Sequence, residues 1–189
     1  MKAKTRVSLV LGAALAGTAA FLIAATCADI DKFYWVDDRL ATGGQPLLEQ
    51  LPALKREGFR TIINLLEPSE YDEAAESAEV RRLGLRYLSI PFRAADPKDE
   101  PVDEFLAAMK DRKIWPAFVH CGSGNRVAAL WMIHRVVVDG WEFADAEIEA
   151  RLLGLKSPNL REFAHEYACR HGKAEARPIP CANRSAGTN

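Results

Sequence analysis

The chain has 189 residues, of which 49% are hydrophobic and 27% are charged, a composition that predicts one domain with a packed core and some tail. Its 25 Lys and Arg residues nearly balance its 26 Asp and Glu residues, which gives a formal net charge of −1. This balance, without any basic block, excludes the electrostatic pattern of a nucleic-acid-binding protein, so we expect no nucleic-acid partner.

The N-terminal part differs in character from the rest of the chain. A basic head at residues 2–6 precedes an uncharged, apolar run at 7–25, and small residues occupy 24–28. This order is typical of a secretory signal peptide, with an uncleaved anchor as the alternative. We therefore expect residues 1–28 to direct export and the domain to be periplasmic or anchored facing the periplasm, with the membrane contacted only through this segment. Lipidation of Cys27 is a further alternative, although the residues before it match a lipoprotein motif only in part.

Hydrophobic periodicity and turn residues predict strands that alternate with helices. In chain order, we expect a strand at 33–36, a turn-rich segment at 40–46, a helix at 47–56, a strand at 60–66, a polar surface helix at 71–83, a strand at 86–90, a polar loop at 92–100, a helix at 102–109, a strand at 115–120, a buried helix at 127–138 and helices at 143–155 and 158–169. This alternation predicts an α/β fold with a central mixed, partly parallel sheet of four to five strands flanked by helices. Residues 29–172 would form the folded domain, and residues 173–189 a flexible tail.

The segment VHCGSGNRVAAL, residues 119–130, joins a predicted strand to the buried helix through a loop with two glycines. The unpaired amides at the start of the helix, together with the helix dipole, place partial positive charge in this loop. The same field favours the reactive thiolate form of Cys121. The glycines allow successive amides to face inward around an anion. The loop residues expected to bind this anion are Gly122, Ser123, Gly124 and Asn125.

Two neighbours of Cys121 complete the candidate site. Arg126 supplies a planar guanidinium fork that grips two oxygens of a tetrahedral anion. His120 is expected to hydrogen-bond to the backbone and to fix the position of Cys121, without moving protons itself. The alternative without chemistry is a buried cysteine in a tight turn, with Arg126 in a salt bridge at the start of the helix.

These residues resemble the protein tyrosine phosphatase superfamily in its compact dual-specificity form: His-Cys, a glycine-rich loop and an arginine that opens a buried helix. Upstream, LATGGQP at 40–46 and TIINLL at 61–66 are similar to the opening of bacterial phosphatase-like domains, including beta-lactamase-hydrolase-like ones. The resemblance covers residues 33–170. It implies that the Cys121 thiolate attacks phosphorus, that a phosphocysteine forms and that water then releases phosphate.

The sequence departs from the phosphatase pattern at two points. Four residues separate Cys121 from Arg126, where the phosphatase loop has five, and Val127 stands where the family commonly has Ser or Thr. A shorter loop encloses a smaller ring of amides. Its length resembles the active loop of rhodanese-type sulfurtransferases, in which the cysteine carries a persulfide. A sulfurtransferase that uses a Cys121 persulfide is therefore an alternative function.

A general acid distinguishes the two reactions, because hydrolysis of a phosphate ester needs a proton for the leaving oxygen. The resemblance implies that this acid is an aspartate on the loop before the cysteine strand. The loop at 92–100 offers Asp96 and Asp99, and we favour Asp96 because Pro97 stiffens the backbone beside it. The alternative is that both are solvated loop residues.

The remaining polar residues are expected to have structural roles or none. Cys169 and Cys181 either form a disulfide, as an exported protein allows, or are unrelated thiols. His165, Cys169 and His171 lack a further ligand, so no metal is expected, and no cofactor is required. A set of acidic residues is expected to form a solvated helix face; these are Glu67, Glu70, Asp72, Glu73 and Glu76.

Three functions follow from this sequence. The first is a cysteine-dependent phosphatase that acts on a phosphorylated protein or a small phosphate ester. The second is the sulfurtransferase, which takes a sulfane-sulfur donor as its substrate. The third is a binding module for anions or proteins without catalysis, which Val127 and the unsettled general acid allow.

Overall fold

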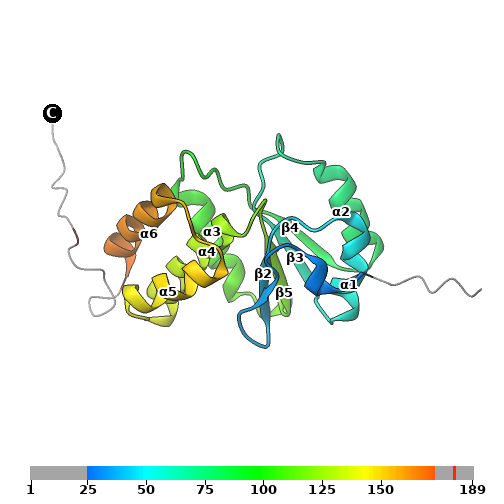
Figure 1. Ribbon diagram of the computed structural model, residues 1–189, viewed down its shortest axis with the longest axis horizontal. Coiled ribbons are helices and arrows are strands. Elements are labelled where there is room, and N and C mark those ends of the chain that lie inside the picture. Colours follow the sequence, from blue (N-terminus) through cyan, green and yellow to red (C-terminus); the bar gives the residue numbers. More distant parts are fainter. Residues whose placement is uncertain (1–24, 173–180, 182–189) are drawn as a thin grey trace, which may run out of the picture.

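The computed structural model describes residues 25–172 and residue 181. A five-stranded sheet lies between two layers of helices (Figure 1), with α1 and α2 on one side and α3 to α6 on the other. The expected signal or anchor at 1–28 falls mostly outside the described residues, as does the expected tail. No helix within the described part of the chain is long and apolar enough to cross a membrane.

The sheet has the strand order β1-β2-β5-β3-β4, and only the short edge strand β1 runs antiparallel to its neighbour. Its strands are β1 (Tyr34–Trp35), β2 (Leu40–Gly43), β3 (Thr61–Asn64), β4 (Arg86–Ser89) and β5 (Ala117–His120). A mixed, mostly parallel sheet flanked by helices confirms the predicted α/β fold class.

Strand β2 was expected to be part of a turn, and this prediction was wrong. All four of its residues are buried, and it pairs with both β1 and β5. Gly43 serves close packing, because a Cβ atom at this position would lie 3.0 Å from the ring of Phe118. Pairing on both sides thus outweighs the turn preference of the glycine-rich sequence.

The helices match the predicted positions to within a few residues. The α-helices are α1 (Leu51–Arg56), α2 (Glu73–Arg82), α3 (Asp99–Lys110), α4 (Asn125–His134), α5 (Phe143–Leu153) and α6 (Pro158–His171). The short 3-10 turns are η1 (Cys27–Asp29), η2 (Leu48–Gln50) and η3 (Arg112–Ile114), and the π-helical turn η4 (Arg135–Asp139) extends α4. Helix α4 is buried on nearly all sides, as its apolar sequence predicts.

Two hydrophobic clusters cover the two faces of the sheet. The larger cluster joins α3 to α6 with the sheet, and Cys121 and Val127 belong to it. The smaller cluster includes Ile62, Phe118 and, from the N-terminal segment, Cys27. The Cys27 side chain is 5% exposed, and this burial disfavours lipidation, since an acylated sulfur must reach the surface.

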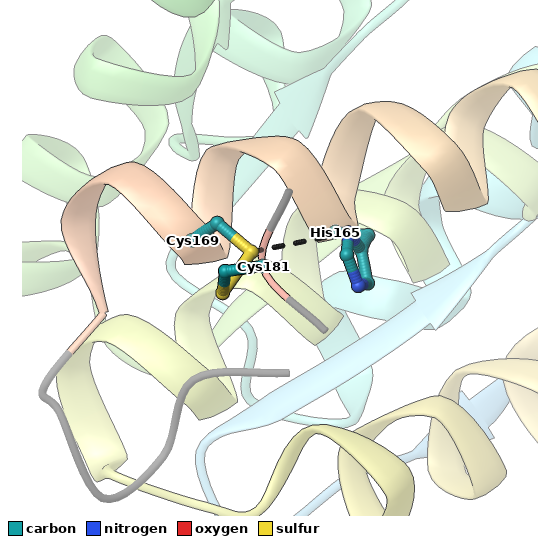
Figure 2. The surroundings of a disulfide bond; sticks show 3 residues. All are labelled: His165, Cys169 and Cys181. Atoms are coloured by element: carbon teal, nitrogen blue, oxygen red, sulfur yellow. Dashed lines mark hydrogen bonds between the residues drawn. A yellow bond between two sulfur atoms is a disulfide. The ribbon is translucent and has the colours of Figure 1, made fainter. Parts of the chain in front are cut away.

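A disulfide joins Cys169, near the end of α6, to Cys181 (Figure 2), which decides between the two alternatives left open by the sequence. The Sγ atom of Cys169 also lies 3.9 Å from Nδ1 of His165, one turn earlier on the same helix. The disulfide therefore anchors a point of the C-terminal segment to the outer helix of the α3–α6 layer.

The packing of Cys27 predicts a protected thiol. Burial, with the nearby charge of Glu57, raises the pKa of this thiol from 9.0 to about 11. Because the thiolate is the reactive form, this difference lowers the reactive fraction about 100-fold. We expect a thiol reagent to modify Cys27 at least about 100-fold more slowly in the native full chain than in urea. Equal rates in the two conditions, measured by peptide mass mapping, would show that the segment around residue 27 is not packed.

Candidate active site

The candidate site lies where the parallel strands end. The register aligns Gly43 with His120 and His120 with Asn64, so β2, β5 and β3 stop at the same edge of the sheet. Cys121 is the first residue after β5, and α4 begins four residues later. The carboxyl edge of a parallel sheet is where ligands of open α/β folds commonly bind.

The loop from Cys121 to the start of α4 is fixed from its outer side. The Lys32 Nζ atom donates a hydrogen bond of 2.9 Å to the Ser123 carbonyl oxygen, and Gly44 forms a β-bridge with Ser123. Gly124 caps α4 with φ of 80°, and a Cβ atom there would lie 3.0 Å from a backbone oxygen of Leu153. Only glycine fits this position without strain. The loop backbone is therefore held in one conformation before any ligand binds.

Two residues of this loop have distinct structural roles. Among the described residues with positive φ the loop contributes Gly124, whereas Gly122 is exposed. The Asn125 side-chain oxygen accepts hydrogen bonds from the backbone amides of Lys156 (2.8 Å) and Ser157 (3.2 Å), so it braces the start of α6.

Cys121 and Arg126 lie together, as the sequence predicts. Cys121 is 1% exposed, and Arg126 is buried on the first turn of α4. The guanidinium packs over the loop, since a Cβ atom at Gly122 would lie 3.5 Å from Nη2 of Arg126. Burial opposes the charge of Arg126, but the Glu70 carboxylate and the Cys121 sulfur hold the pKa of the guanidinium above its ordinary value.

Glu70 is a site residue that the sequence analysis placed on a solvated face. Its two oxygens accept hydrogen bonds of 2.6 and 2.8 Å from Nη1 and Nη2 of Arg126. Weaker contacts link Nη1 to the carbonyl oxygens of Leu65 (3.5 Å) and Phe92 (3.4 Å). The two-point contact fixes the plane of the guanidinium, which also interacts with the Cys121 sulfur. A signal in the sequence was available: Glu70 follows a buried strand that ends at the same edge as the loop.

A cavity of about 530 Å³ opens beside Arg126. It contains two charge pairs, Arg126–Glu70 and Arg93–Glu67, the second with a contact of 3.0 Å. Its lining residues are Glu67, Glu70, Arg93, Ala94, Ala95, Ser123, Asn125 and Arg126. The cavity has the size and polarity for a small anionic group or a modified side chain.

Neither candidate general acid lines this cavity. The Asp96 side chain is exposed and contacts Nζ of Lys98 at 2.9 Å, one residue beyond the cavity-lining Ala95. Asp99, at the start of α3, accepts hydrogen bonds of 2.7 and 2.9 Å from Arg170 on α6. Asp99 therefore has a structural partner, whereas Asp96 stands on the segment that borders the cavity.

His120 and Glu76 also differ from expectation. His120 is fully buried, and its Nε2 atom lies 2.8 Å from the Glu76 carboxylate, where a backbone partner was expected. Glu76, expected on a solvated face, is 3% exposed. A buried charge needs compensating partners, and the short-range pattern of the sequence does not show them. Within the described residues, no three His, Cys, Asp or Glu side chains are grouped to hold a metal ion.

Comparison with known families gives one match over most of the chain. The family model described as "DSP-PTPase phosphatase fused to NAD+ Kinase" matches residues 30–166. Among curated proteins, a beta-lactamase hydrolase-like protein of Xylella fastidiosa (strain Temecula1) is 34% identical over 123 residues, which cover 63% of this chain and 28% of that protein. The chain thus spans about a quarter of the length of this relative.

Solved structures share the fold. A putative phosphatase of Shewanella putrefaciens CN-32 is 26% identical with a TM-score of 0.67, and the match covers 77% of this chain and 97% of that one. The catalytic domain of the PP-IP phosphatase SIW14 from S. cerevisiae has a TM-score of 0.62 at 16% identity, over 73% of this chain and 86% of its own. The second likeness, at this low identity, concerns the fold alone.

The Glu70–Arg126 pair predicts a pH dependence of stability. The hydrogen bonds from Arg126 hold the pKa of the Glu70 carboxyl below its ordinary value of 4.5. The stabilisation is therefore complete above this value and is lost as the pH falls through the lower pKa of the folded state. We expect Glu70→Gln to lower the free energy of unfolding near neutral pH by on the order of 1 kcal/mol, since the carboxylate is partly exposed.

Urea unfolding of Glu70→Gln and of the unmodified chain at a series of acid pH values measures the difference in their free energies of unfolding. This difference should shrink below pH 4.5. Glu49→Gln, at an exposed position of η2, is the matched control and should change stability by less than about 0.5 kcal/mol. A difference between Glu70→Gln and the unmodified chain that stays constant with pH would contradict the ion pair.

Proposed function

The chain belongs to this DSP-PTPase phosphatase family, and we propose that it is a cysteine-dependent phosphatase that acts through a phosphocysteine intermediate. The observation that carries the proposal is the position of Cys121 at the base of a fixed loop, beneath an arginine whose orientation Glu70 sets. A nucleophile, an anion-binding loop and a guanidinium at one point are what phosphoryl transfer to sulfur requires.

In the first step, the Cys121 thiolate attacks phosphorus and forms a sulfur–phosphorus bond. The bond from phosphorus to the leaving oxygen breaks, and its electron pair stays with that oxygen, which takes a proton from the general acid. The loop amides and the positive charge of Arg126 stabilise the negative charge on the other phosphate oxygens. The loop needs little rearrangement for this, because Lys32, Gly44 and Leu153 already hold its backbone.

In the second step, water attacks phosphorus and loses a proton to the same carboxylate, while the sulfur–phosphorus bond breaks and Cys121 leaves as a thiolate. We assign Asp96 as this acid and base. For this role the segment at 92–98 must move, so that the Asp96 carboxylate leaves Lys98 and enters the cavity that Ala95 already borders. Val127 offers no hydroxyl to help the thiolate leave, so this step depends on the loop amides and Arg126.

The substrate and location are part of the same proposal. The cavity suits a phosphorylated protein side chain or a small phosphate ester. Residues 1–28 would export the chain, so that the domain acts on a periplasmic substrate, and residues 29–172 would be the catalytic unit. A metal or another cofactor has no step in this reaction.

One observation favours a second function. Four residues lie between Cys121 and Arg126, a spacing that resembles the sulfurtransferase loop. In that reaction the thiolate attacks the outer sulfur of thiosulfate, sulfite leaves with the bonding electrons, and cyanide then takes the sulfur from the Cys121 persulfide. No general acid is required.

Activity assays with variants test these proposals. We expect the chain to hydrolyse an aryl phosphate and Cys121→Ser to abolish this activity. Arg126→Ala should reduce the activity on the order of 100-fold or more, because it removes the main positive charge that contacts the anion. Arg151→Ala is the matched control, since this exposed arginine pairs with Glu147 on α5. Turnover of thiosulfate and cyanide without hydrolysis of phosphate would sink the phosphatase proposal in favour of the sulfurtransferase.

The role of Asp96 has its own test. Asp96→Asn should lower kcat for an aryl phosphate by about 100-fold, the typical contribution of a general acid. Asp38→Asn, at a carboxylate that is 92% exposed, should leave kcat unchanged. If Asp96→Asn retains full activity, the acid assignment is wrong. If the chain turns over neither phosphate nor thiosulfate, a binding role remains.

A further inference from the structure

A second arginine lines the cavity beside Arg126. Arg93 lies on the segment after β4 and borders the cavity of about 530 Å³ together with Glu67, Glu70 and Arg126. The reaction steps described above use only one of these two guanidinium groups, that of Arg126. The role of Arg93 in the cavity is therefore open to assignment.

The two arginines differ in how firmly their carboxylate partners hold them. The Arg126 side chain is 11% exposed and donates two hydrogen bonds to Glu70. The Arg93 side chain is 62% exposed and contacts Glu67 through Nε alone, at 3.0 Å. No described residue accepts a hydrogen bond from the terminal nitrogens of Arg93. An exposed ion pair of this kind contributes little to stability, so a ligand is able to displace Glu67 with little loss.

The backbone on both sides of Arg93 is tied to the site. Phe92, the residue before it, accepts a hydrogen bond of 3.4 Å from Nη1 of Arg126. Ala94, the residue after it, accepts a hydrogen bond of 2.8 Å from Nδ2 of Asn159 on α6. These contacts place the Arg93 side chain at the cavity, next to a residue that Arg126 itself contacts.

Glu67 and Glu70 belong to one turn and face the two arginines from it. The Glu67 amide donates a hydrogen bond of 2.8 Å to the Glu70 carboxylate, and the Glu70 amide donates one of 2.9 Å to the Glu67 carbonyl oxygen. The turn thus presents one carboxylate to each guanidinium, and the four charges cancel. A second anion in the cavity contacts a free cation only when it replaces Glu67 at Arg93.

We propose that Arg93 is a specificity-determining residue that binds a second anionic group, a phosphate or a carboxylate, which the substrate carries beside the phosphate at Arg126. The inference rests on the proposed phosphatase function, because it names the substrate class of the same site. The guanidinium fork matches two oxygens of either anion. A two-point contact of this kind replaces the single Nε contact with Glu67.

Binding of anions that cannot be hydrolysed tests this subsite without turnover. Titration calorimetry of the full chain compares methylphosphonate, which has one anionic group, with methylene-, ethylene- and propylene-bisphosphonate, which carry a second one at increasing distance. We expect at least one bisphosphonate to bind about 10-fold or more tightly than methylphosphonate, the size of one charge-assisted contact. Arg93→Gln should remove most of this gain in affinity.

Arg39→Gln is the matched control, because the Arg39 side chain is 61% exposed, pairs with two aspartates and lies outside the cavity lining. This variant removes the same charge and should keep the gain from the second phosphonate. Glu67→Gln removes the competing carboxylate and should increase the gain by a factor of about 2 to 5, the strength of an exposed ion pair.

Turnover identifies the source of the second anion. One pair of substrates is a phenyl phosphate with a ring carboxylate and the same ester with a ring carboxamide, which represent a small ester. The other pair is a phosphotyrosine peptide with aspartate beside the phosphorylated residue and the same peptide with asparagine, which represent a protein. We expect a higher kcat/KM for the acidic member of at least one pair, and Arg93→Gln should lower that ratio.

The inference would be overturned if no bisphosphonate bound more tightly than methylphosphonate, or if Arg93→Gln or Glu67→Gln left the gain unchanged. An equal loss of the gain in Arg39→Gln would also contradict it, because that result shows a general effect of charge. Equal kcat/KM values within both substrate pairs would exclude Arg93 from substrate selection.

Binding of phosphonates needs no turnover, so the two proposals fail separately. A gain that depends on Arg93, in a chain that hydrolyses no phosphate, would support the second anion site and contradict the phosphatase function.

Discussion

The parallel pairing of β2, β5 and β3 is the constraint on which the rest of the site depends. Because Gly43, His120 and Asn64 share one register, three strands end at the same edge of the sheet. The chain after β5 then curves into α4 and forms the candidate anion-binding loop, and the chain after β3 supplies the segment that reaches Arg126. A slip of one residue in either pairing would turn His120 to the other face of the sheet and separate it from Glu76.

Two acid–base pairs, formed between segments far apart in the sequence, set the electrostatics of this edge. Glu70 fixes one edge of the Arg126 guanidinium, and Glu76 contacts His120 behind the cysteine. In each pair the carboxylate follows β3 in the chain, whereas the base belongs to the β5–α4 unit. Glu70 is partly exposed, whereas Glu76 and His120 are both buried, so the loss of one partner is more costly in the second pair. The loop after β5 is consequently held between contacts on its outer side and the Arg126 guanidinium.

The sequence predicted the parts of the site that depend on local spacing. A strand, a cysteine, a glycine loop and an arginine on a buried helix lie within about ten residues, and the structure arranges Cys121 and Arg126 accordingly. The contacts made at long range were missed. Glu70 and Glu76 stand in a polar stretch that is also typical of a solvated helix, and their partners lie more than forty residues away in the chain. Strand β2 was missed for a similar reason, because its pairing and the ring of Phe118, not its own residues, determine its conformation.

Rapid acid quenching of the full chain during turnover of an aryl phosphate, followed by measurement of the mass of the Cys121 peptide, detects the proposed intermediate. We expect a phosphoryl group on Cys121 that accumulates within one turnover and disappears as phosphate is released. In Arg126→Ala this adduct should form on the order of 100-fold more slowly or less, because the positive charge over the loop is then missing. A chain that releases phosphate without ever carrying a phosphoryl group on Cys121, or that carries only an added sulfur atom there, would contradict the proposal.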